Sequence, residues 1–313
     1  MMNDLKIFGG NSNVDFTNKV CEYLGVPVGK LTAMKFANDN TFVKFEEPVR
    51  GCDVFLIQSI SRPTNDNLME MLVMLDACRR SSANRITAVI PYYGYGRSDK
   101  KDQPRIPITA RLVADLLVTA GAQRAILLDL HAGQIQGFFN VPVDELEAEK
   151  LLCDYFMKKN LPNLCIVATD VGISKKARDF ATKLDAPLAI IEKRRVGNID
   201  KTETLNLIGD VKGKTALIYD DEIDTAGSLC NAASAMLEAG AKEVYSCATH
   251  GVFSGAAIQR IAESPLKEVV VTDSIYLPPE KKLNKITVLS IAPLFAEAIK
   301  RIHDGRSMSE LFD

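Results

Sequence analysis

The sequence lacks the features that mark several large classes of protein. No apolar run approaches the ~20 residues of a membrane span, and the start, Met1-Met2-Asn3-Asp4, has no apolar signal core. The 38 basic and 40 acidic side chains leave a net charge of −2, which disfavours duplex nucleic acid as a partner. Seven scattered cysteines without a C-x-x-C pair predict neither a disulfide framework nor a zinc site. We therefore expect a cytoplasmic protein that binds neither a membrane nor nucleic acid.

Common catalytic motifs are missing as well. The chain has no G-x-x-x-x-G-K-[ST] loop, so ATP would not be held by a Walker loop. No G-x-G-x-x-G follows the first strand, which weakens the hypothesis of a dinucleotide-binding protein. A G-x-S-x-G elbow and an H-E-x-x-H zinc motif are also absent.

The pattern that is present alternates short apolar strands with amphipathic helices. Strands that are nearly all apolar and separated by helices predict parallel sheets covered on both faces, the doubly wound α/β arrangement. Residues 34–37 and 41–45 flank Asn38-Asp39-Asn40, which predicts a hairpin. The expected strands are 53–58, 86–90, 125–130, 165–169, 188–191, 215–219, 244–249 and 268–272, and the expected helices are 66–81, 109–120, 144–159, 174–184, 225–239 and 291–304.

One short sequence pattern recurs on both sides of the midpoint of the chain. A helix ends in a small residue, and a tight turn, a basic residue and an apolar strand follow, as at 83–86, 121–126 and 240–244. The recurrence indicates two similar halves. We expect domains at residues 1–147 and 148–313, with the last helix free to pack back on the first domain.

The strongest chemical signal is the segment 215–228. An apolar strand is expected to end at Asp220-Asp221, and Asp224-Thr225-Ala226-Gly227-Ser228 is expected to open a helix. Free backbone N–H groups, two hydroxyls and a glycine at a helix start suit an anion. The two carboxylates ahead of them suit hydroxyl groups or a metal. Together these features predict a sugar-phosphate site, whereas an ordinary helix cap would explain Asp224 or Thr225 but not the acidic pair.

Three further groups follow predicted strands, where ligands bind in such folds. His131 and Asp170, each near the end of a predicted strand, could share a divalent ion whose shell is completed by phosphate and water, although His131 could equally be hydrogen-bonded in a turn. Lys193-Arg194-Arg195 could stabilise charge on a transferring phosphoryl group or form a solvated basic turn. The basic loop 91–109 could close over a polyphosphate or be plain surface.

Taken together, these residues resemble the ribose-phosphate pyrophosphokinase (phosphoribosyl pyrophosphate synthetase) family over essentially the whole chain. The motifs that carry the resemblance are V-R-G-C-D-V-F at 49–55, P-Y-Y-G-Y-G-R at 91–97, D-L-H-A-G-Q-I-Q-G-F-F at 129–139, D-D-E-I-D-T-A-G-S at 220–228 and T-H-G-V-F-S-G at 249–255. The resemblance implies two similar doubly wound parallel-sheet domains of phosphoribosyltransferase-like type with the site between them. It implies homodimers or homohexamers, in which the adenine pocket borrows a hairpin from a neighbouring subunit.

The resemblance also implies the reaction and the residue roles. The enzyme would transfer the pyrophosphoryl group of Mg-ATP to the 1-hydroxyl of ribose 5-phosphate, giving phosphoribosyl pyrophosphate and AMP for nucleotide biosynthesis, with Mg²⁺ as the cofactor. Lys193 and Arg195 would be catalytic, and His131 and Asp170 would help to place the metal. ATP would be bound by Phe36, Asn38, Asn40, Arg97, Ser98, Lys100, Lys101 and Arg105, and ribose 5-phosphate by Asp220, Asp221, Asp224, Thr225, Ala226, Gly227 and Ser228; a regulatory site would use Arg50, Ser82, Gln136, Ser307 and Ser309.

A few positions depart from the family pattern. Asn40 stands where the hairpin usually carries an acidic residue, and Ile173 stands where a second glycine usually follows Gly172. Two alternatives stay open: a non-catalytic regulatory homologue of the synthetase, and a type I phosphoribosyltransferase that would share the segment 220–228.

Overall fold

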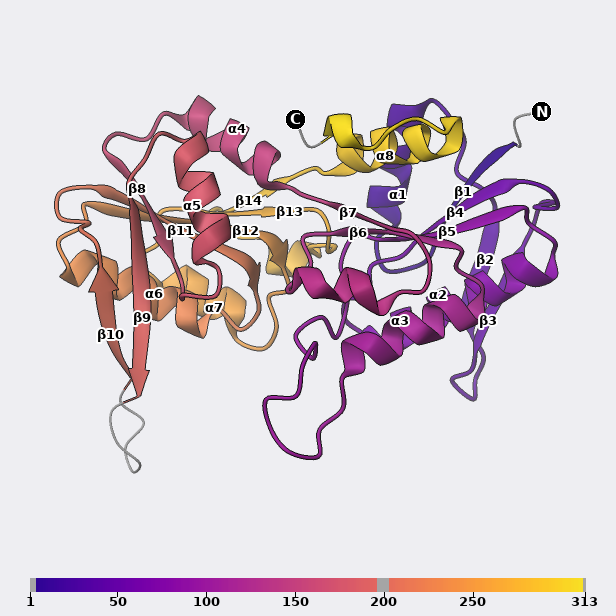
Figure 1. Ribbon diagram of the computed structural model, residues 1–313, viewed down its shortest axis with the longest axis horizontal. Helices are drawn as coiled ribbons and strands as arrows, with labels where there is room; N and C mark the ends of the chain where they lie inside the picture. The colour runs from indigo at the N-terminus through magenta and orange to yellow at the C-terminus, as the bar shows by residue number, and fades with distance from the viewer. Residues whose placement is uncertain (1–3, 196–202, 312–313) are drawn as a thin grey trace. The chain divides into compact units, whose positions relative to one another are not determined.

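The computed structural model describes residues 4–195 and 203–311 of the 313, and the side chains of 193–195 and 203–205 are outside that description. Contacts along the described chain define two units (Figure 1). The first unit contains residues 4–147, 274–276 and 290–311, and the second contains 148–273 and 277–289. No helix in the described part of the chain is both long and apolar enough to cross a membrane.

The first unit is built on a five-stranded parallel sheet in the order β1-β4-β5-β6-β7. An antiparallel hairpin, β2–β3, stands apart from this sheet. The strands are β1 Leu5–Gly9, β2 Leu31–Lys35, β3 Thr41–Phe45, β4 Asp53–Ile57, β5 Arg85–Ile90, β6 Arg124–Leu128 and β7 Val143–Leu146. The helices are α1 Val14–Leu24, α2 Thr64–Arg80, α3 Thr109–Ala120 and α8 Ala292–Asp304, with the short turns η1 Gly133–Phe138 and η3 Ser309–Leu311.

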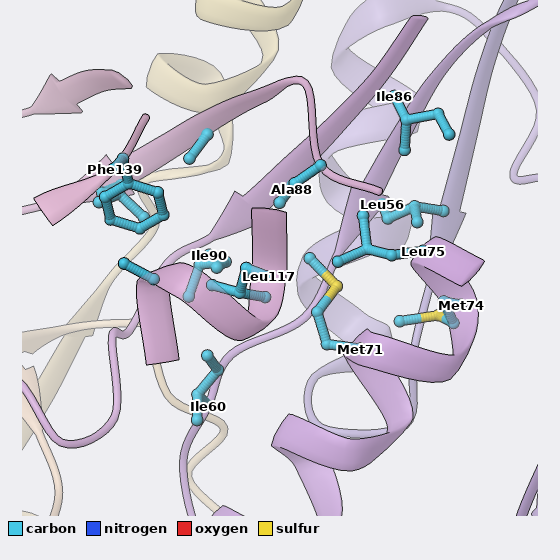
Figure 2. Packing of buried hydrophobic residues seen from close by; sticks show 14 of the residues in the cluster. Leu56, Ile60, Met71, Met74, Leu75, Ile86, Ala88, Ile90, Leu117 and Phe139 are labelled. Carbon is cyan, nitrogen blue, oxygen red and sulfur yellow. The ribbon is translucent and has the colours of Figure 1, made fainter. Parts of the chain in front are cut away.

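Apolar side chains at helical spacing hold α2 against this sheet. Met71, Met74, Leu75 and Cys78 lie on one face of α2 and are buried. Figure 2 shows Met71, Met74 and Leu75 beside alternate residues of the strands, such as Leu56 of β4. The other face of the sheet is covered in part by α1 and α8, whose Phe16 and Phe295 rings make an edge contact at 5.4 Å. The last helix, yellow in Figure 1, therefore belongs to the core of the first unit.

The second unit contains a seven-stranded sheet in the order β10-β9-β8-β11-β12-β13-β14. All neighbouring strands are parallel except β10, which runs antiparallel to β9. The strands are β8 Leu164–Ala168, β9 Leu188–Arg195, β10 Glu203–Ile208, β11 Thr215–Ile223, β12 Glu243–Gly251, β13 Val269–Thr272 and β14 Ile286–Leu289. The helices are α4 Glu149–Lys159, α5 Ser174–Lys183, α6 Gly227–Glu238 and α7 Ala257–Glu263, with the short turn η2 Pro279–Lys281.

Successive residues of β11 pack on opposite faces of that sheet, because the side chains of a strand alternate. Ala216 and Ile218 join a core that includes α6, whereas Leu217 and Tyr219 join a core that includes α4 and α5. Both faces are thus apolar, which explains why the central strands are nearly all hydrophobic. The expected doubly wound, parallel α/β fold is confirmed.

Three expected boundaries were wrong. Residues 143–146, expected as the start of a helix over 144–159, form the edge strand β7, and the helix begins only at Glu149. Their Val-Asp-Glu-Leu pattern has polar residues because a short edge strand is only partly covered. The basic residues 193–195 were expected after the strand at 188–191, but they lie within β9, because β10 pairs with it antiparallel. Asp220 and Asp221 likewise lie within β11, which continues to Ile223.

Candidate functional site

The loop between β11 and α6 has the features of an anion cradle. β11 ends at Ile223 and α6 begins at Gly227, two residues later than expected. Between them Ala226 adopts a left-handed conformation with φ = 58°, and no described side chain caps the helix. The first N–H groups of a helix have no partner within it, and they point toward its start. Thr225 and Ser228 are exposed there, so two hydroxyls lie near these N–H groups.

Asp220 occupies an unusual electrostatic environment in β11. Its Oδ2 accepts a hydrogen bond from Thr169 Oγ1 at 2.8 Å, and its Oδ1 accepts one from the backbone N–H of Asp221 at 2.9 Å. Burial, together with the neighbouring Asp221 carboxyl, raises the pKa of Asp220 from its ordinary value of 3.8 to about 8, although the Thr169 hydroxyl favours the charged form. The group can therefore exist as a neutral acid near neutral pH, able to donate as well as accept a hydrogen bond.

Asp170 follows β8, the strand next to the one that contains Asp220. β8 and β11 are parallel neighbours, with Ala168 opposite Tyr219, so their following residues lie at the same sheet edge. Asp170 is exposed, and its Oδ1 accepts a hydrogen bond from the N–H of Ile173 at 3.1 Å. A Cβ on Gly172 would lie only 3.0 Å from that oxygen, which explains the glycine. Ile173 has φ = −88°, a conformation open to any residue, so the missing second glycine does not strain this loop.

The segment after β12 closes the other side of the cradle. Ser254 donates a hydrogen bond from Oγ to Asp224 Oδ1, and its N–H donates to the Asp224 carbonyl at 3.0 Å. Arg260 of α7 donates to the carbonyl of Thr225 at 2.7 Å. Sequence reasoning recognised the motif 249–255 but assigned no role to Ser254 or Arg260. The available signal was the position of that motif at the end of the strand expected at 244–249, because ligands bind at strand ends in such folds.

In the first unit, the loops that follow β5 and β6 are joined. Asp99, which is buried, accepts a hydrogen bond from Gln134 Nε2 at 2.6 Å. A Cβ on Gly96 would lie 3.8 Å from the Cβ of His131, so the residues beside Arg97 approach the start of the His131 segment. His131 and Arg97 are both exposed. The expected ATP-binding loop and the expected metal-binding histidine are therefore neighbours.

The rest of the expected ATP-binding loop is open to solvent. Lys100, Lys101 and Arg105 are exposed, and Arg105 has a left-handed backbone at φ = 67°. Ser98 is half-buried and acts through its backbone: its N–H donates to Tyr95 and its carbonyl accepts from Ala110 at the start of α3. The loop thus presents cations outward from a fixed base.

The tip of the β2–β3 hairpin presents the other expected ATP contacts. Phe36, Asn38 and Asn40 are exposed, and Phe36 is 48% exposed despite a ring contact with Phe42 at 5.3 Å. Asn38 Oδ1 accepts a hydrogen bond from the N–H of Asn40 at 3.2 Å, which shapes the turn. An exposed aromatic ring beside two amides offers a stacking surface and hydrogen-bonding groups.

The expected catalytic residues can be located only by their backbone. Lys193 and Arg195 lie in β9 opposite Leu205 and Glu203 of β10, and their side chains are outside the described residues. Residues 196–202, which follow Arg195, are also outside the description.

The expected regulatory residues fall into separate contacts. Ser307 and Ser309 share a hydrogen bond at 2.7 Å between their hydroxyls, and Arg301 donates to the carbonyl of Ser307 at 2.9 Å. Ser82 accepts from the N–H of Gly51, next to the exposed Arg50. Gln136, also in this group, donates its side-chain amide to Glu145 of β7.

Two structural observations lie outside these groups. Within the described residues, no three His, Cys, Asp or Glu side chains cluster closely enough to hold a metal by themselves. A surface cavity of about 720 Å³ is lined in part by Leu164, Pro187 and Lys214, where β8, β9 and β11 begin. It lies where these strands begin, at the opposite end of the strands from Asp170 and Asp220, so this hollow is separate from the cradle.

Comparisons with known proteins cover the whole chain. The model of the N-terminal domain of ribose phosphate pyrophosphokinase matches residues 5–121, and the phosphoribosyl synthetase-associated domain matches residues 195–313. The chain is 55% identical to the ribose-phosphate pyrophosphokinase of Caldanaerobacter subterraneus subsp. tengcongensis, over 99% of this chain and 98% of that one. It is 52% identical to that of Bacillus caldolyticus, over 99% and 98%. The crystal structure of phosphoribosylpyrophosphate synthetase from Mycobacterium smegmatis is 45% identical with a TM-score of 0.92, over 96% of this chain and 99% of that one.

Proposed function

Because the chain belongs to the ribose-phosphate pyrophosphokinase family of enzymes, we propose that it transfers the β,γ-pyrophosphoryl group of Mg-ATP to the 1-hydroxyl of ribose 5-phosphate. The products are phosphoribosyl pyrophosphate, for nucleotide biosynthesis, and AMP. The single observation that carries this proposal is the order of groups from Asp220 to Ser228, in which two carboxylates precede an uncapped helix start.

The second unit binds the sugar phosphate. The N–H groups at the start of α6 and the hydroxyls of Thr225 and Ser228 hold the 5-phosphate, and the left-handed Ala226 turns the chain so that these groups converge. Asp220 and Asp221 bind the ribose hydroxyls, which donate hydrogen bonds to carboxylate oxygens. Asp224 is held by Ser254, so it shapes the loop that binds the phosphate.

The first unit binds the nucleotide. Arg97 and the exposed cations Lys100, Lys101 and Arg105 neutralise the phosphates, and the base stacks on Phe36 beside Asn38 and Asn40 of the hairpin that a neighbouring subunit supplies. Asn40 offers both a donor and an acceptor where family members usually carry a carboxylate, which offers only acceptors. The side chain of Ser98 is a minor contact, because this residue acts mainly through its backbone.

The donor groups fit Mg²⁺ held jointly by protein and substrate. Mg²⁺ usually keeps one or two protein ligands together with phosphate oxygens and water. Asp170 suits this role because it is exposed and its Oδ1 is used by one backbone N–H, which leaves Oδ2 to bind the ion. His131, which is exposed, would supply a ring nitrogen. When bound, the ion polarises the phosphoryl oxygens and neutralises their charge.

Positioning and charge neutralisation supply most of the catalysis. The 1-hydroxyl oxygen of the ribose forms a bond to the β-phosphorus and loses its proton to solvent, and the bond from that phosphorus to the bridging oxygen of AMP breaks. AMP leaves as an already acidic phosphate, so no strong general acid is required. Lys193 and Arg195 stabilise the charge that develops on the bridging oxygen.

The activity is tested by incubating the protein with Mg-ATP and ribose 5-phosphate and quantifying the products. We expect AMP and phosphoribosyl pyrophosphate in equal amounts, and release of ADP would contradict attack at the β-phosphorus. A phosphoribosyltransferase would instead release pyrophosphate when given a nucleobase and would need no ATP. A non-catalytic homologue would be inactive alone and would alter the activity of a co-assembled active subunit.

A further inference from the structure

The β2–β3 hairpin is anchored at its base by apolar packing. Leu31, Val43 and Phe45 pack against the core of the first unit, and Phe45 makes an edge contact with Phe8 at 4.7 Å. The tip, residues 36–40, is exposed and has no such packing. Its position therefore depends on polar contacts between the hairpin and the rest of the unit.

Asn11, in the loop after β1, makes one of these contacts. Its side-chain amide donates to the carbonyl of Ala33 in β2 at 3.1 Å and to Glu70 Oε2 at 2.7 Å. Its backbone N–H donates to Glu70 Oε1 at 2.6 Å, and Gln58 donates to the same oxygen at 2.8 Å. Glu70 is only 8% exposed. A buried carboxylate on α2 thus fixes Asn11, and both amide hydrogens of Asn11 are used, one of them to hold β2.

Lys35 makes a second contact nearer the tip. Its ammonium lies 2.8 Å from Asp66 Oδ2 on α2 and 3.0 Å from Asp39 Oδ1 in the turn of the hairpin. These two carboxylates raise the pKa of Lys35, so its charge is secure. One side chain therefore joins the turn of the hairpin to α2.

Asp66 and Glu70 are four residues apart on α2, which places them on the same face of the helix. The two polar contacts thus run from one face of one helix to one strand of the hairpin. We propose that Asn11 and Lys35 are positioning residues that hold the hairpin tip against α2 and so order the base-binding side chains Phe36, Asn38 and Asn40 before ATP arrives. This inference rests on the proposed function of the hairpin. Ordering these groups in advance strengthens binding, because less conformational freedom is lost when the nucleotide binds.

Lys35→Met is the central variant, because it removes both ion pairs and keeps an unbranched side chain at a partly exposed site. Lys35→Arg should restore the contacts, and Asn11→Ala removes the contact to Ala33. Lys44→Met is the matched control: Lys44 is on the same hairpin, but its ion pair at 2.7 Å is with Glu46, not with α2. Two measurements are made, the steady-state constants for each substrate and the hydrogen exchange of the N–H groups of Phe36 and Asp39, which are bonded within the turn.

We expect Lys35→Met and Asn11→Ala each to raise the KM for ATP about fivefold, the size expected from one exposed polar contact. The KM for ribose 5-phosphate and kcat should stay within about twofold. The turn amides should exchange faster in both variants but not in Lys44→Met. Unchanged exchange in both variants would overturn the proposal, and faster exchange with an unchanged KM for ATP would overturn its link to the nucleotide. If the wild-type protein converts neither substrate, the proposed function fails, while hydrogen exchange still decides whether Asn11 and Lys35 hold the tip.

Discussion

His303 Nδ1 lies 2.8 Å from Asp53 Oδ2, and that carboxylate is only 2% exposed. The same carboxylate accepts hydrogen bonds from Arg85, at 2.8 Å from Nε and also from Nη2. Arg85 in turn donates to the carbonyl of Ile302 at 2.9 Å. One buried acid therefore joins β4, β5 and the last helix, α8.

Asp53→Asn should loosen α8. The substitution leaves the Arg85 cation without its counter-charge, which costs about 2–3 kcal/mol when the pair is partly exposed. Native-state hydrogen exchange of the α8 amides reports this local free energy, and we expect exchange about 30- to 100-fold faster. His303→Gln, which keeps an N–H donor, should change exchange by less than about fivefold. Equal protection of α8 in Asp53→Asn and the wild type would contradict this role.

Asp220→Asn should stabilise the protein at high pH. The pKa of Asp220 is about 8 in the folded protein and near 3.8 when unfolded, so between these values the folded chain keeps a proton that the unfolded chain releases. The contribution of the protonated Asp220 carboxyl to the stability of the wild type is fully present below about pH 4 and is lost as the pH rises through 8. Without that titration, we expect the variant to have a Tm at least about 5 °C higher at pH 9 and unchanged at pH 4.

Thermal unfolding as a function of pH measures this difference. Asp154→Asn, at an exposed position on α4, is the control and should follow the wild type at every pH. A constant Tm difference between Asp220→Asn and the wild type from pH 4 to 9 would show that Asp220 does not titrate in this range.

Lys193→Ala should lower kcat far more than it weakens substrate binding. A cation that meets charge only in the transition state contributes about 10²- to 10³-fold to the rate, and we expect a loss of that size with each KM within about threefold. Steady-state kinetics with ATP and ribose 5-phosphate check this. Lys212→Ala is the control and should leave kcat unchanged, because Lys212 lines the cavity at the starts of the strands of the same sheet. A wild-type kcat in Lys193→Ala would contradict the proposed role of Lys193 in stabilising the transition state.

Substitutions at Ala226 should separate backbone shape from side-chain chemistry. A left-handed backbone is strained for a β-branched residue and relaxed for glycine. We expect Ala226→Gly to stay within about 0.5 kcal/mol of the wild type and Ala226→Val to lose about 1–2 kcal/mol. Binding of ribose 5-phosphate, measured by calorimetry, should weaken only in the valine variant. Equal affinity in the two variants would mean that the phosphate does not depend on this turn.

The sequence predicted the interior of each sheet but not its margins. The eight expected strands correspond to β4, β5, β6, β8, β9, β11, β12 and β13, whereas the four edge strands β1, β7, β10 and β14 were not expected. A central strand is covered on both faces and has a neighbour on each side, so it must be nearly all apolar. An edge strand has only one neighbour, and β7 carries the polar residues Asp144 and Glu145. The first helix, α1, and the short helix α7 were also not expected.

The candidate site was predictable where it depends on strand ends. Asp170 and Asp220 were identified because parallel neighbouring strands bring their carboxyl ends together. Thr169, Ser254 and Arg260 were not identified, because their contacts join residues 30 to 51 positions apart. Such hydrogen bonds depend on the register between strands, which periodicity alone does not give.

The return of the last helix to the first unit sets an order of events during synthesis. Asp53 and His303 are 250 residues apart, and at about 5–20 residues per second the ribosome needs roughly 12–50 s to make the chain between them. Throughout that interval the surface of α1 that later packs against α8 is uncovered, even after residue 146 is made and β1 to β7 are complete. A nascent or truncated chain that stops before residue 292 should therefore leave Phe16 exposed and be a substrate for chaperones and proteases.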